Sequence, residues 1–544
     1  MGTENKPLLS IKNLKTIFDL DEGSVKAVDG VSFDIFPQRV LGIVGESGCG
    51  KSVTIKSILR LIETPGRIVE GEILFQTRNQ NEVNINEVDL AKLNPKGKQM
   101  RSIRGNEIAL IPQEPMAAFS PVHTIGNQLI ENILLHQEVK ESEAFEIAIE
   151  RLKEVGIPNP EESMNRYSWE LSGGLRQRAM IGMALTCNPS LLIADEPTTA
   201  IDVTTQAQVL NLIRDLQQKN KMSIIFITHK LKEVLRIADR IAVLRQGKLV
   251  GEVTPSEASE PRLAAMMVGR EVMLQVDKKE SEPGESILEV KGLEARNDLD
   301  EICLSEVDLK VNAGEIVGVA GVQGNGQTEL VEVLTGLRPL KNGILRIGGH
   351  DLSGATPREI TDRGKICHVP EDRHSYGMVD NYSVADNLVL NSYYRSPFAK
   401  GMTIQRESID TNAETLVKKF DVRTPSVQTT GASLSGGNQQ KMVIARELSR
   451  PIQLMIAAQP TRGIDVGSIE FIHQQIVAKR DEGIAVLLIS SELDEIMALS
   501  DRIVVMYRGS IIGEVLNKET TRQELGLLMA GVKSDSENIH HSTP

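Results

Sequence analysis

The sequence contains few cysteines, and they are scattered. Cys49, Cys187, Cys303 and Cys367 stand far apart, and no two of them have the CxxC spacing of a metal or redox pair. This distribution favours reduced thiols over a disulfide framework or a cysteine-ligated metal site. Cys49 lies within a glycine-rich loop, where we expect its thiol to be sensitive to oxidation.

Positive charge and long apolar runs are also lacking. The chain has 61 Lys and Arg against 74 Asp and Glu, a net charge of -13. This balance argues against a nucleic-acid groove, because binding to phosphate backbones needs clustered basic side chains. No apolar run approaches the roughly 20 residues that span a bilayer, and the polar N-terminus has no signal-peptide core. We therefore expect any role at a membrane to depend on partner proteins.

Two glycine-rich loops are present, GESGCGKS from Gly45 to Ser52 and GVQGNGQT from Gly321 to Thr328. Each follows an apolar run that we expect to be a strand, Val40–Val44 in the first case and Glu315–Ala320 in the second. A GxxxxGK[ST] loop between a strand and a helix surrounds phosphates with backbone N–H groups, adds a lysine charge and offers a hydroxyl to Mg²⁺.

The two loops differ at the position that carries the charge. In the first loop Lys51 supplies the cation and Ser52 the hydroxyl. In the second loop Gln327 stands in place of the lysine, although Thr328 keeps the hydroxyl. We expect the second loop to retain its amide groups without the cation.

An internal repeat accounts for the length of the chain. LSGG occurs at Leu171 and again at Leu434, and LLIADEPTTAID from Leu191 corresponds to LMIAAQPTRGID from Leu454; both pairs are 263 residues apart. A chain of 544 residues exceeds what one hydrophobic core usually organises. The two halves therefore represent one fold repeated.

Composition sets the expected domain boundaries. The charged stretch DKKESEPGES, residues 277–286, has few apolar residues and indicates a linker. We place the first domain at 8–276, the second at 287–532 and a flexible polar tail at 533–544.

Within each half, short aliphatic strands alternate with helical patterns, which predicts an α/β nucleotide-binding core. The segment 114–170 has several amphipathic patterns, such as Glu143–Val155, and we interpret it as an inserted helical subdomain with a counterpart at 371–431. The expected core strands are Val40–Val44, Leu191–Ala194, Ser223–Ile227, Leu454–Ala457 and Ala485–Ile489.

Three motifs after the first loop carry a family resemblance. LSGGLRQR from Leu171, LLIADEP from Leu191 and a strand ending in ITH at His229 follow in the order of the ATP-binding cassette (ABC) family. The chain resembles an ABC protein with two fused ATPase domains. The resemblance implies two tandem P-loop domains, each with a RecA-like core and a helical subdomain, and it implies ATP and Mg²⁺ as cofactors.

The resemblance also implies roles for individual residues. Asp195 would hold Mg²⁺, Glu196 would act as general base on the attacking water, and His229 would contact the γ-phosphate. Gln113, in LIPQEP, would sense Mg²⁺ and the water. Phe18 would stack on adenine, although an ordinary core phenylalanine is an equal alternative. The implied ATP-binding set in the first domain is Phe18, Gly45, Gly48, Gly50, Lys51 and Ser52, with Ser52, Asp195 and Gln113 toward Mg²⁺.

In this family the LSGG motif acts on a nucleotide held by the opposite domain. One composite site would thus join the first phosphate loop to Ser435, Gly436 and Gly437. The other would join the second phosphate loop to Ser172, Gly173 and Gly174.

The second composite site has lost most groups of a phosphoryl-transfer centre, and we predict essentially no turnover there. Nucleotide binding without hydrolysis and a purely structural second half both remain open. The positions concerned are Gly321, Gly324, Gly326, Gln327, Thr328, Glu371, Ala458, Gln459 and Ser491, where Gln327, Glu371, Ala458, Gln459 and Ser491 replace the lysine, glutamine, aspartate, glutamate and histidine of the first site.

Two subgroups of the family are represented. Residues 1–229 resemble ATPases of oligopeptide and dipeptide importers, through GESGCGKSVT and IADEPTTAIDVTTQAQVL. Residues 230–544 resemble ATPases of simple-sugar and nucleoside importers of the basic-membrane-protein type, through AGVQGNGQTEL, HVPEDRHSYGMV and AAQPTRGIDVGSIE.

These resemblances imply the ATP-hydrolysing subunit of an importer at the cytoplasmic face of the plasma membrane, with two permease subunits and an extracytoplasmic substrate-binding protein. Nucleosides or simple sugars are the favoured cargo, and oligopeptides are the alternative. A soluble twin-cassette ATPase that acts on ribosomes or DNA, and an ATP-binding scaffold without catalysis, are further alternatives.

Overall fold

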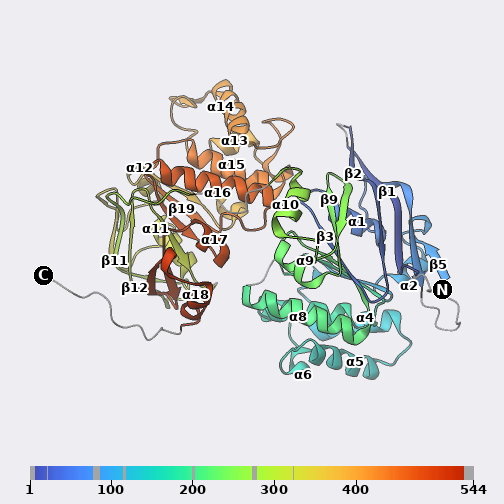
Figure 1. Cartoon of the computed structure of the whole chain (residues 1–544). Coiled ribbons are helices and arrows are strands. Elements are labelled where there is room, and N and C mark those ends of the chain that lie inside the picture. Colours follow the sequence, from blue (N-terminus) through green and yellow to red (C-terminus); the bar gives the residue numbers. More distant parts are fainter. Residues whose placement is uncertain are drawn as a thin grey trace. The chain divides into compact units, whose positions relative to one another are not determined.

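The structure is a computed structural model that describes residues 6–20, 23–77, 86–113, 118–198, 203–271, 278–322 and 324–531. These residues fall into two units, divided between Val272 and Met273 (Figure 1). Each unit combines an antiparallel sheet, a mainly parallel sheet and a set of helices, which confirms the predicted α/β fold.

Unit 1 contains a four-stranded antiparallel sheet of order β2-β1-β4-β5 and a six-stranded sheet of order β10-β9-β3-β8-β7-β6. The strands are β1 Leu9–Leu20, β2 Gly23–Ile35, β3 Val40–Val44, β4 Gly66–Thr77, β5 Asn86–Asp89, β6 Ile108–Ile111, β7 Leu191–Asp195, β8 Ser223–Ile227, β9 Arg240–Arg245 and β10 Lys248–Val253. The α-helices are α1 Lys51–Ile58, α2 Lys98–Ile103, α4 Ile125–His136, α5 Glu141–Glu154, α6 Pro160–Ser163, α7 Gly173–Ala184, α8 Val203–Asn220, α9 Leu231–Ile237 and α10 Glu260–Val268.

Unit 2 repeats both sheets, with orders β12-β11-β14-β15 and β16-β19-β20-β13-β21-β22. The strands are β11 Ser286–Arg296, β12 Ile302–Asn312, β13 Ile316–Ala320, β14 Asn342–Ile347, β15 His350–Asp351, β16 Ile366–Val369, β17 Ala399–Lys400, β18 Thr403–Ile404, β19 Leu454–Ala458, β20 Ala485–Ile489, β21 Arg502–Tyr507 and β22 Ser510–Leu516. The α-helices are α11 Gln327–Leu334, α12 Pro357–Arg363, α13 Val384–Leu388, α14 Arg406–Lys419, α15 Gly436–Leu448, α16 Val466–Asp481, α17 Leu493–Leu499 and α18 Arg522–Met529.

The central strands of both units are the continuous apolar runs that the sequence predicts. Every residue of β3, β8, β13, β19 and β20 is buried, as expected for parallel strands covered on both faces. In unit 1, β3 pairs in parallel with β8, and β8 with β7. The carboxyl ends of these three strands therefore meet at one edge of the sheet, where the phosphate loop, Asp195 and His229 follow them.

The inserted segment of unit 1 is helical, as predicted. The amphipathic run at Glu143–Val155 forms α5, which lies beside α4 and α6 (Figure 1) and also packs against α7. Its counterpart in unit 2 departs from the helical prediction for 371–431, because it also contains the β17–β18 hairpin and a π-helical turn at Arg373–Gly377. Asp372 caps this turn, since its carboxylate accepts hydrogen bonds from the backbone N–H groups of His374 and Ser375.

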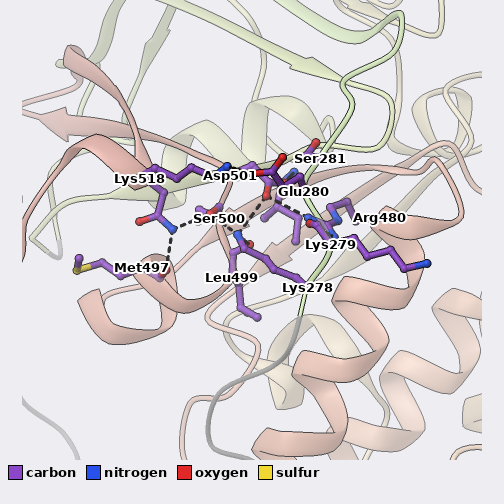
Figure 2. Close-up of polar contacts among 12 residues, drawn as sticks. Lys278, Lys279, Glu280, Ser281, Arg480, Met497, Leu499, Ser500, Asp501 and Lys518 are labelled. Carbon is purple, nitrogen blue, oxygen red and sulfur yellow. Dashed lines mark hydrogen bonds and ion pairs between the residues drawn. The ribbon is translucent and has the colours of Figure 1, made fainter.

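The start of unit 2 is anchored by polar contacts (Figure 2). Lys278 Nζ donates to the carbonyls of Leu499 and Ser500, at 2.9 and 2.5 Å, and lies 3.1 Å from Asp501 Oδ1. Arg480 also forms an ion pair with Asp501, and it donates a hydrogen bond to the Lys279 carbonyl at 3.0 Å. The part of the proposed linker 277–286 that begins at Lys278 is thus bonded to unit 2.

Across the described ranges, the structure contains no helix of the length and apolar character that crossing a membrane requires.

Candidate functional site

The phosphate loop of unit 1 joins β3 to α1 through a left-handed backbone. Gly48 has φ 74° and Gly50, which caps α1, has φ 103°. A Cβ at Gly50 would lie 2.4 Å from the carbonyl oxygen of Ala27, so only glycine fits this position. This backbone turns successive N–H groups toward the start of α1, an arrangement that binds anions.

Lys51 is buried and lies across the loop. Its Nζ donates to the carbonyl oxygens of Gly45 and Glu46, both at 2.8 Å. Its cation is therefore positioned beside the backbone amides that would surround a phosphate.

Cys49 does not have the reactivity that its place in the loop predicts. Its side chain is buried, with 5% of the residue exposed, and burial raises the pKa of the thiol despite the nearby Lys51. A protonated, covered thiol is a poor nucleophile. Burial of the thiol therefore argues against the expectation that Cys49 is sensitive to oxidation.

Asp195 ends β7 in a largely buried position. Burial, together with the neighbouring charge of Glu196, raises the pKa of Asp195 to about 6. The Ser52 hydroxyl forms a hydrogen bond with its carboxylate. A largely buried carboxylate beside a hydroxyl is a set of oxygen donors that suits Mg²⁺. In proteins this ion usually takes one or two protein oxygens, and phosphate and water supply its other ligands.

Glu196 is positioned by backbone and side-chain contacts. Its backbone is left-handed, with φ 47°, and its N–H donates to the Ile227 carbonyl at 2.9 Å. Its carboxylate accepts a hydrogen bond from Gln113 Nε2 at 2.9 Å and lies 3.1 Å from His229 Nδ1. The structure thus brings together Gln113, Glu196 and His229, which come from the ends of three different strands.

Phe18 lies on β1, where it pairs with Val25 and Gly66. It is half-buried, and a Cβ at Gly66 would lie 2.6 Å from its ring. The ring therefore packs over a glycine at the end of the antiparallel sheet and keeps part of its surface exposed.

The two LSGG motifs begin helices. Ser172 caps α7 and accepts from the Leu175 N–H at 3.4 Å, while Gly173 and Gly174 form the first turn. Ser435 begins α15 and accepts from Asn438 Nδ2 at 2.9 Å, followed by Gly436 and Gly437. In each unit the motif presents a serine and the first N–H groups of a helix.

The phosphate loop of unit 2 keeps the backbone of the first loop. Gly324 has φ 88° and Gly326, which caps α11, has φ 103°. The Gln327 amide lies against Gly321, where a Cβ would be 2.3 Å from Gln327 Nε2. A neutral amide therefore takes the place that Lys51 occupies in unit 1, with the Thr328 hydroxyl beside it on α11.

The catalytic positions of unit 2 form a different hydrogen-bond network. Gln459 has the same left-handed backbone as Glu196, with φ 47°, and its N–H donates to the Ile489 carbonyl at 2.7 Å. Its side-chain oxygen accepts from the backbone N–H and the hydroxyl of Ser491, both at 3.0 Å. Ala458, at the end of β19, presents no carboxylate.

Two features of unit 2 were not predicted from the sequence. Glu371 forms an ion pair with Arg462, and the Nε2 atom of His368 on β16 is buried. The ion pair could have been found, because the repeat replaces Gln113 by Glu371 and Thr199 by Arg462, two changes of opposite charge. No pattern marks His368, which stands where the first repeat has Leu110.

A pocket of about 160 Å³ lies beside the second phosphate loop. It is lined by Gly321, Gly324, Gln327, Thr328, Val331, Glu332, Leu337, His368, Pro370, Glu371, Asp372, Tyr376, Ala458, Gln459, Arg462, Ile489 and Ser491. No group of three or more His, Cys, Asp or Glu side chains in the described part of the chain could hold a metal ion.

Comparisons with known proteins agree with this architecture. The family model described as "ABC transporter" matches residues 28–199 and 304–462. The guanosine import ATP-binding protein NupO of Bacillus subtilis is 39% identical, over 93% of this chain and 95% of its own length. The glucose import ATP-binding protein TsgD13 of Haloferax volcanii is 37% identical, over 97% and 96%.

A relative of the peptide type aligns over a similar range. The glutathione import ATP-binding protein GsiA of Escherichia coli is 32% identical, over 93% of this chain and 85% of its own length. The chain is therefore similar both to ATPases of nucleoside and sugar importers and to an ATPase of a glutathione importer. With two family matches, one in each half, the chain belongs to the ABC transporter family, as an ATPase with two fused nucleotide-binding domains.

Proposed function

We propose that this chain is the ATPase subunit of an importer and that it hydrolyses ATP in unit 1 alone. The observation that carries the proposal is the environment of Glu196, whose carboxylate lies within 2.9 Å of Gln113 Nε2 and 3.1 Å of His229 Nδ1. At the same backbone position unit 2 has Gln459, an amide that cannot accept a proton from water.

In unit 1, each residue has a distinct task. The loop amides and Lys51 bind the β- and γ-phosphates, and Glu196 accepts a proton from the attacking water. Gln113 and His229 hold the Glu196 carboxylate in place, with His229 on the side that would face the γ-phosphate. Ser52 and Asp195 would hold Mg²⁺, whose positive charge would offset the negative charge of the phosphates.

For unit 2 we propose that no hydrolysis takes place. Ala458 and Gln459 remove both carboxylates, and Gln327 removes the lysine charge. Loss of the general base alone costs about 10²–10⁴ in rate, and here the metal ligand is lost as well.

We also propose that the LSGG motifs complete the sites in trans, as the family resemblance implies. Ser435, Gly436 and Gly437 would act on the nucleotide bound by unit 1. Ser172, Gly173 and Gly174 would face the second phosphate loop. The exposed position of Ser172 at a helix start leaves its hydroxyl accessible for such a role.

Nucleosides or simple sugars are the proposed cargo, because NupO is named for guanosine import and TsgD13 for glucose import. Peptides are a second candidate, which the similarity to GsiA favours. In either case the proposed partners are two permease subunits and an extracytoplasmic binding protein, with this chain at the cytoplasmic face of the plasma membrane.

A surface in unit 1 fits a permease contact. Between α4 and α5, a hollow is lined by Asn127, Ile130, Glu131, Leu134, Leu135 and Glu141. Leu134 and Leu135 are 41% and 71% exposed there, and this adjacent apolar pair is the surface on which we propose that a permease subunit docks.

The test is cargo uptake and ATP turnover by the assembled importer in membrane vesicles. Lys51→Ala is expected to abolish both, and the matched variant Gln327→Ala is expected to leave both near wild type. Guanosine and a glutathione-sized peptide, offered separately, distinguish the two cargo classes. Equal loss in both variants, or uptake that persists in Lys51→Ala, would refute the one-site proposal.

A further inference from the structure

A short stretch of unit 1 carries positive charge without carboxylates beside it in the sequence. Residues 90–106, between β5 and β6, contain no Asp or Glu but have five cations, Lys92, Lys96, Lys98, Arg101 and Arg104. This stretch contrasts with the whole chain, in which acidic side chains outnumber basic ones and the net charge is -13. We call these five side chains the basic surface of unit 1.

The fold turns this surface toward solvent. Met100 and Ile103 of α2 are 0% and 2% exposed, and they fix the helix on the core of unit 1. Lys98 and Arg101 belong to the opposite face of the helix and are exposed, and Lys96 in the preceding loop is exposed as well. These cations are therefore accessible to a partner.

Most of the basic surface has no acidic partner. Among the described residues, Lys92 forms an ion pair with Asp89 at 3.0 Å, and the other four cations form none. Burial, together with the positive charge of Arg101, lowers the pKa of the Arg104 guanidinium. Like charges that are gathered in this way favour the binding of an anionic partner.

The basic surface lies beside the proposed permease contact. Gly105 follows Arg104, and a Cβ at Gly105 would lie 2.7 Å from Nε2 of His136, the last residue of α4. Leu134 and Leu135, on which we propose that a permease subunit docks, immediately precede His136 in the chain. A surface next to a permease contact would lie close to the bilayer that holds the permease.

The two neighbouring surfaces differ in charge. The hollow at the proposed permease contact is lined by the carboxylates of Glu131 and Glu141 as well as by leucines, and this mixed lining suits a protein partner. Residues 90–106 offer only cations, and a cluster of four to eight Lys and Arg at a membrane is the pattern that attracts anionic lipid headgroups. Anionic lipid therefore fits the basic surface better than it fits the hollow.

The corresponding segment of unit 2 is nearly balanced in charge. The stretch before β16 has Arg358, Arg363 and Lys365 against Glu359 and Asp362. All three of its cations are exposed, as those of α2 and its preceding loop are. They provide a matched control, because the same number of positive charges can be removed at the same place in the repeat.

We propose that the basic surface of unit 1 binds the anionic headgroups of a phospholipid bilayer, so that the chain contacts the membrane directly as well as through a permease. The expected orientation of this surface rests on the proposed function, whereas binding to lipid needs no permease. Salt screens charges beyond a Debye length of about 8 Å at physiological ionic strength, so the acidic remainder of the chain opposes this contact only weakly.

The experiment measures co-sedimentation of the purified full-length chain with protein-free vesicles at about 0.15 M salt. The chain is expected to bind vesicles of phosphatidylglycerol and phosphatidylcholine in equal parts, and not vesicles of phosphatidylcholine alone. The triple variant Lys96→Gln, Lys98→Gln, Arg101→Gln is expected to bind the anionic vesicles at least about tenfold more weakly. About 1 M salt is expected to release the parent chain.

The control is the triple variant Arg358→Gln, Arg363→Gln, Lys365→Gln, which is expected to bind the anionic vesicles within twofold of the parent. Both triple variants change exposed side chains, so the melting temperature and ATP hydrolysis are expected to stay at the parent values.

Three results would overturn the proposal. They are a parent chain that does not bind the anionic vesicles, equal binding to both kinds of vesicle, and a unit 1 triple variant that binds as the parent does. If that variant keeps vesicle binding but fails to assemble with a permease, the basic surface is a protein contact instead. Because the vesicles contain no permease, failure of the importer proposal would leave the vesicle result unchanged.

Discussion

Glu196 Oε2 lies 3.1 Å from His229 Nδ1 at the carboxyl edge of the unit 1 sheet. Gln113 Nε2 donates a hydrogen bond to the same oxygen at 2.9 Å, so that one carboxylate oxygen contacts two side chains from neighbouring loops. Unit 2 has kept the backbone of this arrangement and changed its chemistry, because Gln459 has the same φ as Glu196 but accepts its hydrogen bonds from Ser491.

Replacement of His229 tests whether this contact matters for catalysis. His229→Ala is expected to lower kcat by about 10²-fold or more, because Glu196 loses one of the two groups that position it. Ser491→Ala is the matched change in unit 2 and is expected to leave kcat within twofold. Steady-state ATP hydrolysis measures both, and similar losses in the two variants would contradict the separate roles of the units.

The proposed action of LSGG in trans predicts an asymmetry between the two motifs. Ser435→Arg is expected to abolish hydrolysis, because Ser435 would complete the site of unit 1. Ser172→Arg is expected to retain substantial hydrolysis, since under this proposal its motif would act on the second phosphate loop. Turnover by the two purified variants decides the matter, and a greater loss in Ser172→Arg would reverse the pairing.

Arg480 is expected to contribute to the stability of unit 2. Its side chain is 1% exposed and contacts Asp481, Asp501 and the Lys279 carbonyl. Arg480→Met should destabilise unit 2 by about 2 kcal/mol, because the change removes the charged hydrogen bonds to Asp481 and Asp501, although Asp501 keeps Lys278 as a partner. Denaturant unfolding measures the loss of unfolding free energy.

A surface pair provides the control for Arg480. Arg522 pairs with Asp494, but both side chains are about half exposed. Arg522→Met should therefore cost less than about 1 kcal/mol. Equal losses of unfolding free energy in the two variants would show that the contacts of Arg480 contribute no more to stability than an exposed ion pair does.

Cys49 is expected to resist modification in the native chain. Its thiol is buried and its pKa is raised, so the reactive thiolate is scarce at neutral pH. Cys187, which is partly exposed, should react with iodoacetamide before Cys49 does. Mass spectrometry of briefly labelled protein identifies the order, and early labelling of Cys49 would contradict the buried geometry.

Sequence alone predicts those parts of the structure that depend on local patterns. The strands β3, β8 and β20 were predicted to the residue because a short, mainly apolar run between polar segments indicates a strand covered on both faces. The convergence of Asp195 and His229 followed from the parallel order of such strands.

Features that depend on tertiary contacts were not predictable in the same way. Burial of Cys49 arises from packing between the loop and the antiparallel sheet, and no spacing in the sequence reports it. No pattern in the sequence reports that His368 Nε2 is buried without a hydrogen-bond partner among the described residues. The hairpin β17–β18 consists of two-residue strands, which are too short for any periodic pattern to indicate.

The most direct test of hydrolysis in unit 1 alone is ATP turnover by the purified chain beside Glu196→Gln and Gln459→Glu. The account predicts that Glu196→Gln loses at least about 10²-fold in kcat, whereas Gln459→Glu remains within twofold of wild type, because a carboxylate at position 459 still lacks the lysine and the metal ligand. Turnover that survives Glu196→Gln, or that rises severalfold in Gln459→Glu, would contradict it.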